Sequence, residues 1–403
     1  MSKKKTPKLR ALMPALQNKK YFNYGGQGPL PQPSLEAITT SWIKIQELGP
    51  FTNKVWPFIA SEQQATRQCL AKICGITSSR IALTENVTSG CILPLWGLPF
   101  FTGDRLLISD CEHPGVVSAC RELADRKLLE IDILQVKQLR QGDTKQNDTE
   151  QSLLENLEKA LKPKTRLVVL SHILWNTGQR MSISAVSKRL STHPNKPFLL
   201  VDAAQSFGQI PVREAASKAD IYAFTGHKWA CGPEGLGAVA ISERVLEESK
   251  PTLIGWRSLQ HEGSCQLDNP IPFHIDSRRF EIATSCVPLL AGLRCSLRLL
   301  EEEGSELRRL KKILESSSKL WNVLNKLEGV HPILTGPPPS GLVSFQIPSK
   351  PSTREIVKLL GREGVWIRDL EDPICLRACL HITSNDDEIK TLMKAIQKLV
   401  CIN

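Results

Sequence analysis

The sequence between Pro197 and Lys228 contains PFLLVDAAQSFG at 197–208 and ADIYAFTGHK at 219–228. Each segment holds an apolar run of strand length, and continuous apolar runs are typical of strands buried on both faces of a parallel sheet. Asp202 ends the first run and Lys228 follows the second. Ligands of open α/β sheets bind outside the carboxyl ends of the strands. We therefore expect this acid and this amine to meet in a functional site.

The same kind of signal recurs along the first two thirds of the chain. Apolar strand runs alternate with helical patterns such as Leu153–Leu161, which predicts an α/β fold with a mostly parallel, seven-stranded sheet. Gln141–Glu150 is predicted to be a surface connection, and helices are expected over Ser34–Glu47 and Ser61–Cys74. The expected strands are Ile81–Leu83, Arg105–Ile108, Ile131–Leu134, Leu167–Leu170, Phe198–Val201, Ile221–Phe224 and Gly237–Ile241.

Past Pro251 the pattern changes and predicts a smaller α+β domain at the C-terminus. Residues 251–280 are irregular, and a long helical stretch, a strand and a closing helix are expected at Val287–Leu327, Leu342–Phe345 and Asp386–Val400. We expect residues 1–20 to form a basic tail and a segment that joins the small domain. The large domain is expected over residues 21–278 and the small C-terminal domain over residues 279–403.

Charge does not predict a nucleic-acid partner. The formal net charge is +11, but the dense basic run is confined to Lys3–Lys5 with Lys8 and Arg10, and such a run is typical of a solvated tail. The aromatic-rich segment Tyr21–Pro31 that follows is expected to be an ordered loop, because disordered segments are poor in aromatic residues.

Twelve cysteines are scattered without a Cys-x-x-Cys pair, so we expect reduced thiols and no metal site. No apolar stretch approaches the roughly 18 residues that a membrane span needs. Leu9–Leu16 is interrupted by Arg10 and Pro14, so it does not resemble the apolar region of a signal peptide. We therefore expect a cytoplasmic protein with no membrane partner.

The residues at the strand ends suit pyridoxal phosphate (PLP), which needs a lysine, an acid at its ring nitrogen, a phosphate cradle and a group against its ring. Lys228 is the lysine candidate, in a glycine-flanked turn. Asp202 is the acid candidate, although it could instead cap a helix. Gln205 is suited to the ring hydroxyl. His113 lies beyond another strand, where an imidazole either stacks on a ring or serves a structural role.

The phosphate candidates lie in two places. Thr88, Ser89 and Gly90 follow a strand and open a helix, so the Thr88 hydroxyl and the two following backbone amides form a plausible anion site. Thr225 and His227 flank the lysine turn and are further candidates.

These motifs are similar to those of a known family. VDAAQS at 201–206 and DIYAFTGHKW at 220–229, with the nearby glycines, resemble the class V aminotransferases, which include cysteine desulfurases and have the type I PLP fold. The segments Tyr21–Pro31, Ser171–Gly178 and Ile254–Arg257 resemble the cyanobacterial cysteine/cystine C–S lyases more than the desulfurases.

The resemblance implies roles for individual residues. Lys228 would hold the cofactor covalently, and Arg377 would bind the substrate α-carboxylate, a task suited to a bidentate guanidinium. Arg279–Thr284 matches a segment whose threonine reaches the neighbouring subunit's phosphate, which implies a homodimer with shared active sites. The implied cofactor contacts are Asp202, Gln205, His113, Thr88, Ser89, Gly90, Thr225, His227, Asn176 and Thr284, and the implied substrate contacts are Arg377, Arg368, Asn176 and Trp256.

One segment departs from the desulfurases. Arg377 follows Arg368 by only nine positions (377 − 368), which leaves no room for the long loop that carries the nucleophilic cysteine in group II desulfurases. Cys375 is expected to be a buried thiol. The sequence therefore predicts a PLP-dependent lyase that performs β-elimination on L-cystine, with L-cysteine as a further candidate, giving pyruvate, ammonia and a persulfide or sulfide.

Several alternatives stay open. Arg368 would meet the distal carboxylate of cystine or would make a structural salt bridge. Within the fold, a cysteine desulfurase or a class V aminotransferase is the alternative function, and a noncatalytic binding protein is an alternative of another class. The sequence does not identify the sulfur acceptor.

Overall fold

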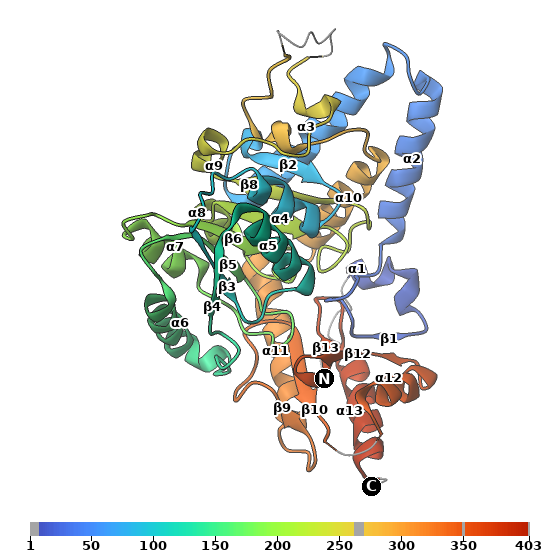
Figure 1. Cartoon of the computed structure of the whole chain (residues 1–403). Helices are drawn as coiled ribbons and strands as arrows, with labels where there is room; N and C mark the ends of the chain where they lie inside the picture. The colour runs from blue at the N-terminus through green and yellow to red at the C-terminus, as the bar shows by residue number, and fades with distance from the viewer. Residues whose placement is uncertain (1–7, 262–269, 349–350, 402–403) are drawn as a thin grey trace.

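The computed structural model describes residues 8–261, 270–348 and 351–401. The predicted Lys3–Lys5 run lies outside the described residues. The rest of the chain forms a large α/β unit and a smaller α+β unit, with the orange-to-red C-terminal elements below the central sheet in Figure 1.

The central sheet has seven strands in the order β2-β8-β7-β6-β5-β3-β4, which confirms the predicted fold class. β8 runs antiparallel to both of its neighbours, and the other neighbouring pairs are parallel. All the predicted strands of this unit are present. Their bounds are β2 Ile81–Thr84, β3 Arg105–Ser109, β4 Glu130–Leu134, β5 Thr165–Ser171, β6 Phe198–Asp202, β7 Ile221–Thr225 and β8 Gly237–Ile241.

Helices cover both faces of this sheet, so its central strands are buried on both sides and their side chains divide between two apolar cores. The prediction of a helix at Leu153–Leu161 is confirmed. The helix begins earlier, however, so the predicted surface connection Gln141–Glu150 is partly wrong: Gln146–Glu150 form the first turns of this helix, where Asp148 interacts favourably with the helix dipole. The helices are α3 Val55–Cys74, α4 Val87–Trp96, α5 Pro114–Lys127, α6 Gln146–Ala160, α7 Ile183–Ser191, α8 Arg213–Lys218 and α9 Glu243–Glu248.

The predicted helix over Ser34–Glu47 is α2, Gln32–Leu48, and the helix predicted from Ser61 is α3, which begins at Val55. Pro57 falls in the first turn of α3, where a missing N–H leaves no hydrogen bond unmade. Both helices pack against α10 (Pro288–Glu302), which lies beside α2 in Figure 1.

The long helical stretch predicted over Val287–Leu327 is present, but it is divided. The structure has two helices there, α10 and α11 (Glu306–Leu324), separated at Gly304, whose φ of 122° is unfavourable for other residues. Ser305 then caps α11 by accepting the N–H of Arg308.

The small unit is built on a four-stranded antiparallel sheet in the order β12-β13-β10-β9. The predicted strand at Leu342 and the closing helix are both present. The elements are β9 His331–Pro332, β10 Leu342–Gln346, α12 Thr353–Arg362, β11 Val365–Trp366, β12 Arg368–Glu371, β13 Ile374–Cys379 and α13 Asp386–Cys401.

The segment before residue 21 packs on this small unit. β1 (Lys20–Tyr21) pairs in parallel with β11, and Arg10, in the short helix α1 (Lys8–Ala11), forms an ion pair with Glu388 at 2.8 Å. Leu9 is buried beside it. The expectation of a solvated tail is therefore wrong for Arg10, because the carboxylate of Glu388 lies within reach of its guanidinium. The predicted domain boundaries stay a prediction.

Candidate active site

The carboxyl ends of β6 and β7 bring Asp202 and the lysine turn to one edge of the sheet. The strands pair in parallel with Asp202 opposite Ala223, and β7 ends at Thr225, three residues before Lys228 (228 − 225). Asp202 is buried, and its Oδ1 accepts the N–H of Ala204 at 2.8 Å. Its side chain therefore makes a local cap while remaining beside the lysine.

Lys228 lies among charges that set its protonation. Burial lowers the pKa of Lys228 to about 8, Asp202 opposes this shift, and Arg377 and Arg368 add to it. The sequence-predicted lysine, acid and two arginines therefore act on one another electrostatically. At pH 7 about a tenth of Lys228 is the neutral amine, which is the form that reacts with a carbonyl.

The phosphate candidates form two groups. Beside the lysine, the Thr225 hydroxyl and Nδ1 of His227 are 2.7 Å apart. At the start of α4, Asn86 caps the helix, since its side chain accepts the Ser89 N–H at 2.9 Å and its carbonyl accepts the Gly90 N–H at 3.1 Å.

Both predicted amide donors of that helix therefore have protein partners. The amides of Val87 and Thr88 come first in the helix and have no intrahelical acceptor. Thr88 is exposed. A phosphate role for Thr88, Ser89 and Gly90 stays a prediction.

Gln205 links the site to the N-terminal loop. Its Nε2 donates to the carbonyl of Gly25 and its Oε1 accepts the indole N–H of Trp229, each at 2.9 Å. One amide hydrogen of Gln205 is left for another acceptor. The predicted contact with a ring hydroxyl therefore stays a prediction and uses that hydrogen.

The loop at Tyr21–Pro31 is ordered and packs against the lysine turn. Gly28 donates its N–H to the carbonyl of His227 at 2.7 Å, and a Cβ on Gly28 would lie 2.1 Å from the Lys228 carbonyl oxygen. Tyr24 stacks on His381 with ring centroids 4.3 Å apart. Sequence reasoning predicted the order of this loop but missed its partners, which are distant in the chain.

His113 follows β3 and caps α5. Its Nδ1 accepts the Gly115 N–H at 3.2 Å, and its ring lies 6.1 Å from that of Trp175. Burial lowers the pKa of His113, and Lys228 and Arg368 act in the same direction. A structural role is thus present, and stacking on a cofactor ring stays a prediction.

Arg377 is the most unusual side chain of the site. It is 1% exposed, and its Nη1 donates to the Trp175 carbonyl at 2.6 Å. Within the residues that the structure describes, its Nε and Nη2 have no hydrogen-bond partner, nor has Oδ1 of the neighbouring Asn176. Buried polar groups are normally paired, so this guanidinium and this amide have free hydrogen-bonding capacity that is suited to a ligand.

Arg368 stands directly opposite Arg377 on the neighbouring strand β12. Side chains at opposite positions of an antiparallel pair share one face of the sheet, and like charges placed there repel. Arg368 is exposed. The two arginines therefore place two positive charges on one face of the sheet, and an anionic ligand would reduce their repulsion.

Cys375 shares that face but is fully buried, and burial raises the pKa of its thiol to about 12. A thiol that is neither accessible nor ionised is a poor nucleophile. The prediction that Cys375 is a buried thiol agrees with this geometry.

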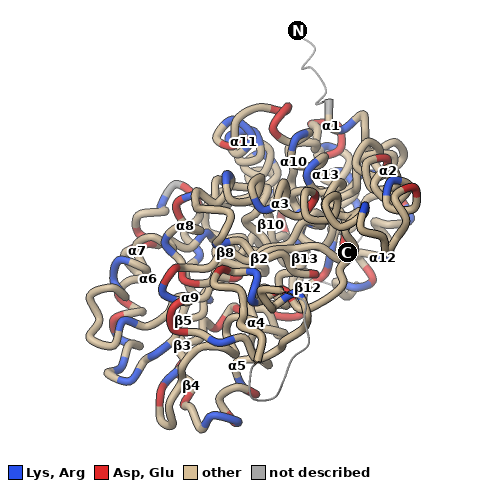
Figure 2. Tube along the Cα trace, turned by 90° about the horizontal axis from the view of Figure 1, so that it is seen from above, with Lys and Arg blue, Asp and Glu red and all other residues tan. Residues whose placement is uncertain are grey.

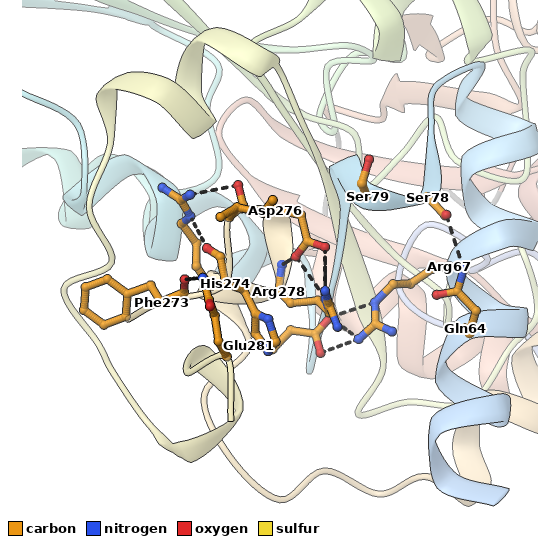
Figure 3. A network of polar contacts seen from close by, with 12 residues as sticks. Gln64, Arg67, Ser78, Ser79, Phe273, His274, Asp276, Arg278 and Glu281 are labelled. Atoms are coloured by element: carbon orange, nitrogen blue, oxygen red, sulfur yellow. Dashed lines mark hydrogen bonds and ion pairs between the residues drawn. The ribbon is translucent and has the colours of Figure 1, made fainter. Parts of the chain in front are cut away.

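Trp256 and Thr284 are not brought to Lys228. Both line a separate cavity of ≈ 520 Å³, in which Trp256 packs edge-on against Trp56 with centroids 6.3 Å apart. Three residues before Thr284, Glu281 forms a bidentate ion pair with Arg67, with Nη2–Oε distances of 2.6 and 2.8 Å (Figure 3). Thr284 itself is exposed.

Taken together, the residues fit PLP. A lysine with a lowered pKa, a buried acid, a hydroxyl and imidazole pair beside the lysine and a buried, unpaired arginine converge at one end of the sheet. Lys228, Asp202, Gln205, Thr225 and His227 would hold the cofactor. The arginines would then remain for a carboxylate substrate.

Basic and acidic residues are interspersed along the tube in Figure 2. Across residues 8–261, 270–348 and 351–401, His, Cys, Asp and Glu nowhere gather as a group of three or more suited to a metal ion. Among the described helices, none combines the length and apolar character of a membrane span.

Comparisons with known proteins show the family and the fold. A family model described as Aminotransferase class-V matches residues 58–391. A protein of Pyrococcus abyssi named "Probable cysteine desulfurase" is 24% identical over 97% of each chain. A solved structure of the cystine C–S lyase C-DES with its reaction product cysteine persulfide is 39% identical, with a TM-score of 0.88 over 96% of this chain and 99% of that one.

A second C-DES structure, a lysine-to-alanine variant with glycine covalently linked to the PLP cofactor, is 38% identical with the same TM-score and covers 96% of this chain and 98% of that one. The apo cysteine desulfurase of Thermococcus onnurineus NA1 is 23% identical over the whole of both chains, with a TM-score of 0.85, and shows the shared fold.

Proposed function

The chain belongs to the class V aminotransferase family, and from that premise we propose that this PLP enzyme is a C–S lyase that eliminates from L-cystine. The products would be pyruvate, ammonia and cysteine persulfide, formed from one cystine and one water. The observation that carries the choice of substrate is the cross-strand pair of Arg368 and Arg377, in which Nε and Nη2 of the buried arginine have no hydrogen-bond partner among the described residues.

The cofactor, when bound, withdraws electrons from the substrate Cα, so that the Cα proton becomes acidic and sulfur can leave from Cβ. Asp202 would balance the charge of the ring nitrogen, since a buried carboxylate is costly without a cationic partner. Lys228, with its pKa lowered to about 8, is able to accept the Cα proton as an amine and to return a proton at neutral pH.

The arginines orient the substrate. Arg377 would bind the α-carboxylate through Nε and Nη2, together with the Asn176 amide, which also donates to the Asp372 carbonyl at 3.1 Å. Arg368 would bind the distal carboxylate, which cystine has and cysteine lacks. Departure of a persulfide is easier than departure of a thiol, because the persulfide is the more acidic group.

The test compares Arg368→Gln with the unchanged protein on two substrates. With cystine, kcat/KM for pyruvate release should fall about 10- to 30-fold, because one charge-assisted hydrogen-bond pair worth about 1.5–2 kcal/mol is lost. With an S-alkyl cysteine, which has a single carboxylate, kcat/KM should change less than about threefold. Equal losses on both substrates would assign Arg368 a structural role.

The alternatives give different products. A desulfurase would leave a persulfide on the enzyme and release alanine, and an aminotransferase would need an added keto acid. Pyruvate release from cystine alone separates the lyase from both. A noncatalytic binding protein would release none, even though it would show a cofactor absorption band that Lys228→Ala removes.

We also propose a cytoplasmic homodimer in which Thr284 and Trp256 of one subunit complete the site of the other. Both line the cavity beside α2, where Phe51 is 84% exposed and Trp42 is half-exposed, a concentration of apolar surface suited to burial by a second copy. The free cysteines among the described residues suit a reducing compartment. Sedimentation and PLP titration of Thr284→Ala test the assembly.

A further inference from the structure

A second carboxyl, that of Glu112, is buried at the same edge of the sheet and has no part in the mechanism above. Glu112 lies between Cys111 and His113 in the turn after β3 and is 6% exposed. Its Oε1 accepts the Ser109 hydroxyl at 2.5 Å and the Ser171 N–H at 2.7 Å, and its Oε2 accepts the Ser171 hydroxyl at 2.8 Å.

These three hydrogen bonds join two neighbouring strands at their carboxyl ends. Ser109 is the last residue of β3 and Ser171 is the last residue of β5, and the two strands pair in parallel. The chain after β3 leads at once to His113, and the chain after β5 leads to Asn176. The Glu112 carboxylate therefore connects the two loops that carry these predicted site residues.

Glu112 also lies close to Asp202. Ser171, which donates twice to Glu112, is the register partner of Asp202 on the adjacent strand β6. Burial is the main cause that raises the pKa of Glu112 to about 7, and the negative charge of Asp202 adds to the shift.

Other titratable groups face Glu112 as well. They are the thiols of Cys91 on α4, Cys111 in the same turn and Cys120 on α5. Burial raises the pKa of each thiol, so all three are neutral near pH 7. Among the described residues, Asp202 is the charged group whose field shifts the pKa of Glu112.

We propose that Glu112 is a positioning residue of the cofactor site, whose carboxylate fixes the loops of His113 and Asn176 and adds a second negative charge one strand away from Asp202. The inference rests on the proposed placement of the ring nitrogen at Asp202. A cation there cancels the charge of Asp202, which favours the ionised form of Glu112. By reciprocity, ionised Glu112 strengthens cofactor binding.

The affinity for PLP should rise with pH around the pKa of Glu112. Cofactor binding lowers the pKa of Glu112 from its value of about 7 in the free protein. Binding is therefore favoured above pH 7, where Glu112 is already ionised, and weakens as the pH falls below 7, because a proton must be released. Each unit by which the pKa falls appears as a factor of about ten in affinity.

The experiment measures the PLP dissociation constant of the apoprotein by absorbance titration between about pH 5.5 and about pH 8.5, a range that brackets the pKa of Glu112. Glu112→Gln keeps the size of the side chain and its hydrogen bonding, since the serine hydroxyls can also accept. We expect it to bind PLP about 3- to 10-fold more weakly than the unchanged protein above pH 7, with the ratio approaching one at the acid end.

Asp110→Asn is the matched control. Its Oδ1 accepts the backbone N–H groups of Val136 and Lys137, and an asparagine oxygen can keep both bonds while the charge is lost from the same turn. We expect no pH-dependent change in PLP affinity for this variant.

Two results would overturn the inference: a Gln variant whose affinity ratio does not change with pH, or an equal effect of Asp110→Asn. If Glu112→Ala binds PLP more weakly and Glu112→Gln binds PLP as tightly as the unchanged protein at every pH, the role of Glu112 is only structural. Lys228→Ala separates the two proposals. If the unchanged protein binds PLP no more tightly than Lys228→Ala, the proposed function is overturned as well.

Discussion

The lowered pKa of Lys228 makes a quantitative prediction about how the apoprotein takes up its cofactor. The pKa falls from 10.5 to about 8, chiefly through burial. At pH 7.5 an ordinary lysine is about 0.1% neutral amine, and a lysine with a pKa of about 8 is about 24% neutral. Because the amine is the nucleophile, the larger neutral fraction alone should make Lys228 react with PLP about two orders of magnitude faster than an unperturbed lysine of equal access.

The assay is the initial rate of absorbance change when apoprotein is mixed with PLP over a range of pH. The rate should rise with pH and level off above about pH 8. Arg368→Gln removes a cation, so it should raise the pKa of Lys228 and move the midpoint to higher pH. Asp202→Asn removes an anion, so it should move the midpoint to lower pH.

The titration of PLP itself is common to all three proteins, so differences between their midpoints report Lys228. A midpoint near 10.5 in the unchanged protein would refute the claim that burial lowers this pKa. Shifts of the same sign in the two variants would refute the electrostatic account, because the removed charges are opposite.

Two further predictions concern residues around this lysine. Cys375→Ala should keep pyruvate release from cystine within about twofold, because the thiol is buried and un-ionised, and a persulfide trapped on Cys375 by alkylation and mass spectrometry would contradict the lyase proposal. Gly28→Ala should weaken PLP binding at least about tenfold, since its Cβ would lie 2.1 Å from the Lys228 carbonyl oxygen, whereas Gly361→Ala, whose Cβ meets Trp366 at an ordinary 3.4 Å, should bind PLP normally.

Much of the fold could be predicted because apolar runs identify buried strands directly. Phe198–Asp202 and Ile221–Thr225 are continuous apolar runs that end in polar residues, and the structure places them side by side. The direction of β8 could not be predicted, since an apolar run reads the same in a parallel and an antiparallel strand. The break at Gly304 was missed because the helical pattern continues on both sides of it.

The sequence likewise predicted some residues of the candidate site and missed others. Asp202 and Lys228 were found because each follows a strand. The roles of Glu112 and Gly28 were missed because their partners, Ser171 and His227, are distant in the sequence. The sequence also indicated the role of Asn86, because asparagine is a preferred N-cap. Its side chain accepts the Ser89 N–H, which was predicted to bind an anion.

The site of the free protein has more cationic than anionic side chains. Lys228, Arg368 and Arg377 are cationic groups beside the buried Asp202. Within the part of the chain that the structure describes, two nitrogens of the buried Arg377 guanidinium lack a hydrogen-bond partner. Such an arrangement is costly in the free protein, and removal of the charge in Arg377→Met should not lower the thermal midpoint of the apoprotein. A phosphate and two carboxylates would supply the missing anions. Loss of binding without loss of stability is therefore expected from that variant, and a marked fall in stability would show that Arg377 serves the fold instead.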